Sequence, residues 1–269
     1  MKNLKELFEI RKKLKKDKKL VHSIVSKIGV FEICNFTLAT GARIICADAI
    51  EEVEEVTKNA DSLTISLANI NKTRFESQKS ALESAKQNNK PVSLDIVGVG
   101  ISDFRRNILN ELFKIKIPEV IKGNFTEIES LYKGYKTIGI DELENDSNDI
   151  FYKKSVVKEL SKKLNSVVLA TGEVDIISNG EDVVTISNGN DFMPQIVATG
   201  CILNSIIGAY LTELDPLNAA IISVLLFDIS GEISKGSSPI ERFIDMQGVF
   251  YNLDYETVKD KMRLEYEKI

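Results

Sequence analysis

The chain has 269 residues, of which 43% are hydrophobic and 28% are charged, a composition typical of a globular protein with a substantial core. Its net charge of -5 gives no reason to expect a nucleic-acid partner. No apolar run approaches the roughly 20 residues that span a bilayer, and the charged N-terminus lacks the apolar segment of a signal peptide. We therefore expect a cytoplasmic protein without a membrane partner.

Cysteine and histidine usage narrows the chemistry further. Cys34, Cys46 and Cys201 are an odd number of thiols at distant positions, which argues against a disulfide framework and for a reduced protein. No two of them have zinc-ligand spacing, and His22 is the single histidine, so a His-rich metal site is excluded.

The first element expected is an N-terminal helix with Leu4, Leu7, Phe8 and Leu14 facing inward and the basic run 11–19 as its solvated end. Short β-rich runs and longer helical patterns then alternate. Strands are predicted at 43–46, 62–66, 92–97, 119–122, 167–170, 175–178 and 183–187. Helices are predicted at 27–40, 51–58, 72–88, 103–114, 125–132 and 149–163.

This alternation predicts an α/β fold with a central, mostly parallel sheet and helices on both faces. The pair Asn179-Gly180 between the last two strands is a type I′ hairpin signal, so we expect an antiparallel edge there. Beyond Cys201 the chain is expected to be largely helical, at 200–213, 216–235, 238–250 and 255–266. There is no internal repeat or linker, which favours a single domain over residues 1–269.

Asp95 is the first candidate site residue. It ends the apolar run that begins at Val92, and Gly98 and Gly100 follow it. A carboxylate at the carboxyl end of a parallel strand lies where open α/β sheets bind ligands. A turn or helix-capping aspartate is an equally good interpretation of Asp95 alone.

The strand predicted at 119–122 leads into Lys122, Asn124 and Glu127. Asn124 and Glu127 have the spacing of a capping box, which is the structural interpretation. In the functional interpretation, Glu127 and Asp95 hold magnesium, which accepts one or two carboxylates together with substrate phosphates, while Lys122 contacts phosphate oxygens.

Thr171 follows the next strand, and the turn Ala198-Thr199-Gly200-Cys201 runs directly into an apolar helix. The free N–H groups and the dipole of a helix start favour an anion, and they can lower the pKa of a thiol placed there toward neutrality. The alternative is an ordinary turn with Cys201 as a small buried hydrophobe. Together with the three strand ends, the turn composes a phosphoryl-transfer site.

The segments 95–100, 121–128, 171–175 and 187–201, with 21–24 and 40–55 upstream, resemble those of the hydroxyethylthiazole kinase family. The resemblance extends from Leu20 to about Phe250. It implies a ribokinase-like fold and the ATP- and magnesium-dependent phosphorylation of the hydroxyl of 4-methyl-5-(2-hydroxyethyl)thiazole in thiamin salvage. It also implies a homotrimer with active sites at subunit contacts.

The resemblance assigns roles to particular residues. Cys201 matches the catalytic cysteine, and Asp95 and Glu127 match the metal-site carboxylates. The ATP-binding residues implied are Lys122, Thr171, Asn124, Thr199 and Gly200, and the substrate-binding residues implied are Cys46, Ala198 and Ser26.

Several of these positions depart from the family pattern. Lys122 replaces an arginine and so keeps the charge but loses bidentate geometry. The other departures are Ser26 for asparagine, Cys46 for methionine, Asp48 for histidine, Ile96 for proline and Ala198 for the first glycine of the turn. If that turn needs a positive φ, the Cβ of Ala198 costs roughly 1–2 kcal/mol.

Because the departures concentrate around the acceptor, three alternatives stay open. The enzyme could phosphorylate another small primary alcohol, such as a hydroxymethylpyrimidine. It could be an NAD(P)H-hydrate dehydratase of the same fold, although the corresponding turn there ends in aspartate rather than in Cys201. It could also be a non-catalytic ligand-binding relative, against which the retention of Asp95, Glu127 and Cys201 argues.

Overall fold

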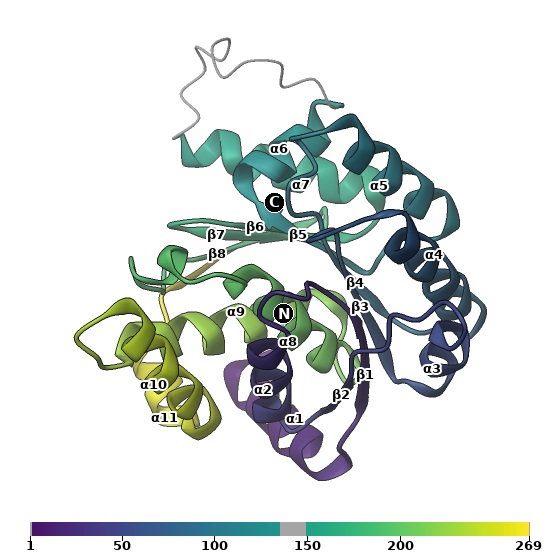
Figure 1. Ribbon diagram of the computed structural model, residues 1–269. Coiled ribbons are helices and arrows are strands. Elements are labelled where there is room, and N and C mark those ends of the chain that lie inside the picture. The colour runs from purple at the N-terminus through teal and green to yellow at the C-terminus, as the bar shows by residue number, and fades with distance from the viewer. Residues whose placement is uncertain (1, 135–148, 269) are drawn as a thin grey trace.

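The computed structural model describes residues 2–134 and 149–268, and within these residues nine strands form one sheet in the order β2-β1-β3-β4-β5-β6-β7-β8-β9 (Figure 1). The strands are β1 (Leu20–Ile24), β2 (Arg43–Ile45), β3 (Ser62–Ser66), β4 (Val92–Asp95), β5 (Val120–Asn124), β6 (Val167–Thr171), β7 (Asp175–Ser178), β8 (Asp182–Ile186) and β9 (Leu264–Lys268).

The strands from β2 to β6 in this order pair in parallel, and β7, β8 and β9 follow in antiparallel pairs. In the register of the central strands, Asp95 lies opposite Lys122, and Asn124 lies opposite Thr171. The carboxyl ends of β4, β5 and β6 therefore meet at one edge of the sheet, which is the arrangement that the alternating sequence pattern predicts.

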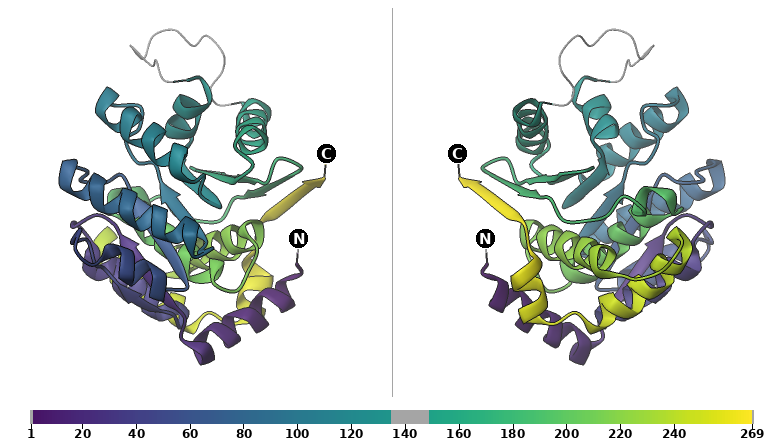
Figure 2. Two further views of the ribbon diagram at one scale, coloured as in Figure 1. Left: turned by 90° about the vertical axis from the view of Figure 1, so that its right-hand side faces the viewer. Right: turned by 90° about the vertical axis from the view of Figure 1, so that its left-hand side faces the viewer.

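Helices cover both faces of the sheet (Figures 1 and 2). One face carries α1 (Leu4–Asp17), α2 (Val30–Thr40), α8 (Thr199–Leu211), α9 (Pro216–Ile233), α10 (Pro239–Asn252) and α11 (Tyr255–Lys261). The other carries α3 (Val53–Asn59), α4 (Lys72–Gln87), α5 (Asp103–Ile115), α6 (Phe125–Tyr132) and α7 (Ile150–Leu164). The predicted mostly parallel α/β architecture is confirmed.

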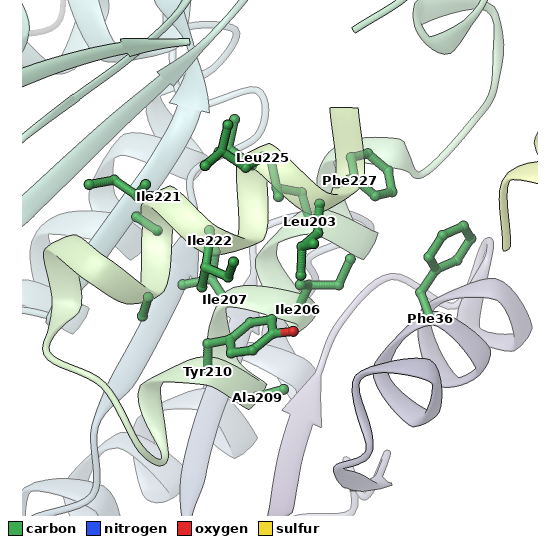
Figure 3. Packing of buried hydrophobic residues seen from close by; sticks show 14 of the residues in the cluster. Phe36, Leu203, Ile206, Ile207, Ala209, Tyr210, Ile221, Ile222, Leu225 and Phe227 are labelled. Carbon is green, nitrogen blue, oxygen red and sulfur yellow. The ribbon is translucent and has the colours of Figure 1, made fainter. Parts of the chain in front are cut away.

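The helices α8 and α9 form the centre of the first layer. Both are apolar on nearly every side, and Figure 3 shows side chains such as Ile206, Tyr210 and Ile222 packed between them. Among the described residues, α9 alone has the length and hydropathy of a membrane span, but 83% of it is buried inside the protein. Its apolar composition is thus explained by its place in the core.

Most helix starts follow from local capping. Asn3 and Asn124 each begin a helix with a complete capping box, whose partners are Glu6 and Glu127. The helix α8 differs, because its N-cap is Ala198, which has no side-chain acceptor. The first N–H groups of α8 are therefore left for another acceptor.

Several local predictions were wrong. The end of the chain leaves α11 at Lys261 and forms β9, which covers β8 and makes β9 the outer edge of the sheet (Figure 2). The strand β1 lies in a segment for which no strand was predicted. In the hairpin, only Gly180 has a positive φ, so the turn is not type I′. In α1, Arg11 is buried rather than solvated, and its guanidinium donates to the Phe250 carbonyl at 2.6 Å.

Candidate active site

A pocket of about 980 Å³ opens at the carboxyl ends of β4, β5 and β6, opposite the start of α8. It brings together most residues that the sequence pointed to: Ser26, Asp95, Lys122, Asn124, Glu127, Thr171, Ala198, Thr199, Gly200 and Cys201. These residues come from segments far apart in the chain, and the sheet register together with the position of α8 places them around one cavity.

Asp95 is the centre of the polar cluster. It is 1% exposed, and its Oδ1 lies 3.2 Å from the Lys122 ammonium. Its Oδ2 accepts hydrogen bonds from Cys201 Sγ at 3.3 Å and from Ser66 Oγ at 3.2 Å. Both oxygens of this buried carboxylate therefore have partners, an ammonium and two neutral donors, which offset the cost of its burial.

Lys122 is held in the same floor. Burial by itself lowers the pKa of the Lys122 ammonium, but the negative charges around it, above all Asp95, outweigh burial and raise that pKa overall. The ammonium lies beside the start of α8, because a Cβ added to Gly200 would be only 2.5 Å from Nζ. A fixed positive charge and a helix N-terminus thus converge on one point, which is a site for an anion.

Cys201 is the third residue of α8 and is 6% exposed. Burial and the neighbouring Asp95 raise the pKa of its thiol to about 12. The expectation that the helix start lowers this pKa was therefore wrong, because desolvation and a carboxylate at 3.3 Å outweigh the helix dipole. At neutral pH Cys201 is a thiol that donates a hydrogen bond, not a thiolate.

Glu127 fits both interpretations of its sequence position, as a helix-capping residue and as a carboxylate of the site. Its Oε2 accepts from the Asn124 N–H at 2.8 Å, which completes the capping box, and its Oε1 accepts from the Gly98 N–H at 2.7 Å. Burial raises the pKa of this carboxyl, although the two N–H groups oppose the rise. The same carboxylate lines the pocket, so capping does not remove it from the site.

Thr171 lies at the end of β6, where its hydroxyl donates to the Gly123 carbonyl at 3.3 Å.

Ala198 has φ 72° and ψ 5° and is therefore in the left-handed region that favours glycine. The positive φ that makes a Cβ costly at this position of the turn is confirmed. The turn also packs tightly against Gly29, where an added Cβ would be 2.5 Å from the Ala198 Cβ.

Cys46 does not line the large pocket. It lines a smaller pocket of about 290 Å³ together with Ser26, Asp48 and Arg74. Ser26 borders both pockets, and its hydroxyl donates to Asn69 Oδ1 at 2.6 Å. Of the three residues implied for the acceptor, Ser26 and Ala198 thus share the pocket of Cys201, and Cys46 lines only the smaller pocket.

A buried acid pair in the wall of the large pocket was missed by the sequence analysis. Asp175 and Asp228 both line it. Burial, followed by the charge of Asp175, raises the pKa of Asp228 well above its usual range. The signal was present in the sequence, since Asp228 is the one carboxylate well inside the apolar α9, and a lone acid inside such a helix needs a partner.

The described residues contain no group of three or more His, Cys, Asp or Glu side chains that could hold a metal ion. The two carboxylates that line the pocket, Asp95 at the end of β4 and Glu127 in the first turn of α6, suit magnesium, which keeps several waters and completes its shell with substrate phosphates. The donor set therefore fits a metal–nucleotide complex better than a resident metal.

Comparisons with known proteins identify the family of the chain. The model of the hydroxyethylthiazole kinase family matches residues 11–250. Hydroxyethylthiazole kinase 1 of Methanosphaera stadtmanae is 35% identical over 87% of this chain and 85% of its own length. The hydroxyethylthiazole kinase of Methanobrevibacter smithii is 33% identical over 97% of both chains.

Among solved structures, the hydroxyethylthiazole kinase protein of Pyrococcus horikoshii OT3 superposes with a TM-score of 0.89 at 25% identity, covering 98% of this chain and 100% of that one. This similarity confirms the expected ribokinase-like fold. The extent of the family match and the identities to its members show that the chain belongs to the hydroxyethylthiazole kinase family.

Proposed function

We propose that this protein transfers the γ-phosphoryl group of ATP to the hydroxyl group of 4-methyl-5-(2-hydroxyethyl)thiazole. The observation that carries the proposal is the cluster of Asp95, Lys122 and Cys201 at the start of α8, in a pocket large enough for a nucleotide and an acceptor. Such a cluster offers positive charge, backbone donors and a proton acceptor at one point. These groups are what phosphoryl transfer requires from a protein.

The phosphate end of ATP is assigned to the start of α8. The N–H groups of Thr199, Gly200 and Cys201 have no side-chain cap to satisfy them, and the Lys122 ammonium lies beside them. Thr171 and Asn124 line the same pocket. We assign magnesium to Asp95 and Glu127, which would hold it largely through water; when bound, the ion neutralises phosphate charge.

The acceptor hydroxyl is assigned to the space in front of Cys201. Because its thiol keeps its proton at neutral pH, Cys201 orients the hydroxyl by hydrogen bonding rather than acting as a thiolate base. As the hydroxyl oxygen bonds to the γ-phosphorus, the bond from that phosphorus to the β–γ bridging oxygen breaks and ADP leaves, while the hydroxyl proton passes to Asp95 by exchange through the Cys201 thiol. A loose transition state requires this proton to leave only late, so a weak base suffices.

The acceptor side of the site contains charged side chains. The smaller pocket, which Ser26 also lines, contains Cys46 and the charged pair of Arg74 and Asp48, whose atoms Nε and Oδ2 are 3.7 Å apart. A charged wall of this kind favours a second candidate, an alcohol with a polar ring such as a hydroxymethylpyrimidine.

The test is ATP consumption by the purified protein with a panel of thiazole, pyrimidine and sugar alcohols. We expect thiazole phosphorylation that depends on a divalent metal. A much higher kcat/KM for a pyrimidine alcohol would move the assignment to the second candidate. The absence of turnover with every alcohol would contradict the kinase proposal itself.

We also propose that the chain assembles as a homotrimer, as the family resemblance implies. Large apolar side chains are exposed on and next to α2 and β2, among them Ile28, Phe31 (73% exposed), Leu38 and Ile45. A patch of this kind is typical of an interface between subunits. Light scattering is expected to give about three times the 30.0 kDa of the chain; an active monomer at assay concentration would contradict the proposal.

A further inference from the structure

The turn after β4 contains a peptide group that is held from both sides. The N–H of Gly98 donates to Glu127 Oε1 at 2.7 Å. The oxygen of the same peptide group is the Val97 carbonyl, and it accepts from Nη1 of Arg105 at 2.9 Å. Arg105 lies in the first turn of α5. A guanidinium and a carboxylate of the candidate site are therefore linked through a single peptide group.

This peptide group needs a partner to keep its orientation. Gly98 has a φ of 71°, and a glycine changes backbone conformation more easily than other residues because it has no Cβ. Rotation of the peptide plane would turn the N–H away from Glu127. The guanidinium opposes that rotation by contact as well as by its hydrogen bond, since a Cβ added to Gly98 would be 3.4 Å from both Cζ and Nη1 of Arg105.

Arg105 also connects this turn to the neighbouring strand end. The same Nη1 donates to the Leu67 carbonyl at 2.5 Å, directly after β3. The N–H of Leu67 in turn donates to the Asp95 carbonyl at 3.0 Å. In the described part of the chain, the side-chain hydrogen bonds of Arg105 go to these backbone carbonyls rather than to a carboxylate. The guanidinium thus braces the backbone next to both carboxylates of the candidate site.

The capping box alone does not fix the Glu127 carboxylate. Its Oε2 accepts from the Asn124 N–H at 2.8 Å, a bond within its own helix start. This bond holds one oxygen and leaves the other free to swing around it. The Gly98 N–H holds the second oxygen, so the plane of the carboxylate is set only when the turn after β4 is in place.

We propose that Arg105 is a positioning residue, which holds Glu127 in its orientation toward magnesium through the peptide group of Val97 and Gly98. The proposal rests on the proposed function, because the role of Glu127 toward the ion is part of it. Groups that orient a metal ligand typically change metal affinity or activity 10–100-fold when they are removed. Arg105 lines neither of the two pockets, so its loss should leave the KM for the alcohol unchanged.

The first test needs neither metal nor substrate. The chain contains two Val-Gly pairs, Val97-Gly98 and Val99-Gly100. Labelling valine carbonyls with ¹³C and glycine amides with ¹⁵N therefore reduces a carbonyl-filtered NMR spectrum to two amide signals. Val97→Ile removes the signal of Gly98 and so assigns both. The rate of amide hydrogen exchange is then measured at each signal.

Arg106→Met is the matched control for Arg105→Met, because Arg106 is the next residue of α5 and donates to the Gly100 carbonyl at 2.9 Å instead. In Arg105→Met the Gly98 amide should exchange about tenfold faster, as the loss of one hydrogen bond to a charged group predicts, while Gly100 keeps its rate. Arg106→Met should leave Gly98 slow. Arg105→Lys should recover part of the protection, because an ammonium also has donors for two carbonyls.

Two outcomes of the exchange experiment would overturn the proposal. Wild-type exchange at Gly98 in Arg105→Met would mean that the guanidinium does not hold the peptide group. Equal acceleration at Gly98 and Gly100 would mean that the whole turn has loosened, which is a merely structural role.

The second test measures the metal directly. Manganese replaces magnesium in the presence of a non-hydrolysable ATP analogue, and its broadening of the Gly98 signal gives the metal affinity without turnover. We expect this affinity to fall about tenfold in Arg105→Met, to be intermediate in Arg105→Lys and to stay unchanged in Arg106→Met. An unchanged affinity in Arg105→Met would refute the positioning role.

Steady-state kinetics separate this role from a general defect. The magnesium concentration for half-maximal activity should rise about tenfold in Arg105→Met, with the KM for the alcohol unchanged; an equal rise in both would contradict the proposal. A wild-type protein without kinase activity would refute the proposed function instead. The exchange and manganese experiments would still decide the role of Arg105 in that case, because neither requires turnover.

Discussion

Gly200, the second residue of α8, lies against the Lys122 ammonium, and replacing this glycine with alanine tests whether the ammonium positions phosphate. A Cβ at residue 200 would be 2.5 Å from Lys122 Nζ and 3.7 Å from Cε. To reach ordinary contact at 3.4 Å, Nζ must retreat by about 0.9 Å. The obstacle is the end of a flexible side chain, so the backbone of α8 can remain in place.

Gly200→Ala is expected to have a large effect on catalysis and a small effect on stability. Misplacing a catalytic group by about 1 Å costs about 100-fold in rate, or about 2.7 kcal/mol. We therefore expect kcat/KM for ATP to fall about 100-fold. Alanine is favoured over glycine within a helix by up to about 1 kcal/mol, which offsets the strain on the ion pair of Lys122 and Asp95. The free energy of unfolding should thus stay within about 1 kcal/mol of wild type.

The assays are steady-state kinetics with varied ATP, and urea unfolding. Gly248→Ala is the matched control, because an added Cβ there meets nothing within 4 Å in the exposed part of α10. This control should keep wild-type kinetics and gain slightly in stability. The Cβ at residue 200 could weaken nucleotide binding by displacing Lys122 or by colliding with the nucleotide. The double variant Gly200→Ala with Lys122→Ala distinguishes these two causes when its affinity for a non-hydrolysable ATP analogue is compared with that of Lys122→Ala.

If Lys122 is the obstacle, the alanine at residue 200 should have little further effect on that affinity once Lys122 is removed. An equal loss with and without Lys122 would mean that the Cβ collides with the nucleotide itself. Wild-type kcat/KM in Gly200→Ala would refute the role of Lys122 as the phosphate-positioning cation.

Three further predictions follow from the same site. Asp95→Asn leaves the Lys122 ammonium buried without a counter-charge, so the free energy of unfolding measured in urea should fall by about 3 kcal/mol. Adding Lys122→Met should restore much of this stability. An unchanged free energy of unfolding in Asp95→Asn would mean that the pair is not buried. Gly29→Ala places a Cβ 2.5 Å from the Ala198 Cβ at a φ of 79°, so it should destabilise by about 2–4 kcal/mol, and adding Ala198→Gly should recover the part due to the collision. The pKa of the Cys201 thiol rises from 9.0 to about 12 on folding, so its contribution to stability is complete below about pH 9 and declines toward pH 12. Between about pH 8 and pH 10.5 the melting temperature should therefore fall less in Cys201→Ala than in the wild type. Equal falls in the two proteins would contradict the raised pKa.

Much of the fold and of the site was determined by the sequence alone, because the relevant signals are local. The capping residues Asn3 and Asn124 mark helix starts within four residues of chain. Alternating strand and helix patterns predict parallel strands, and parallel strands bring their carboxyl ends to one edge. The sequence therefore predicts that Asp95, Lys122 and Thr171, placed at three such ends, lie close together.

Other properties depend on contacts between distant segments. Residues 264–268 carry charged residues typical of helices, yet they form β9 because β8 offers a free edge to pair with. Arg11 belongs to a basic run, but carbonyls at the end of α10 bind its guanidinium and bury it. In both cases the partner lies far away in the chain, so a local pattern cannot report it.

The chemistry of the thiols depends on the tertiary structure in the same way. The helix start before Cys201 is visible in the sequence, but the burial and the Asp95 carboxylate that raise its pKa are brought by other elements. Cys34 and Cys46 are separated by a helix end, a turn and a strand, and only the packing of α2 on β2 brings their sulfurs within 3.5 Å. Sequence determines which groups a site can contain, whereas packing determines their distances and desolvation, on which protonation and reactivity depend.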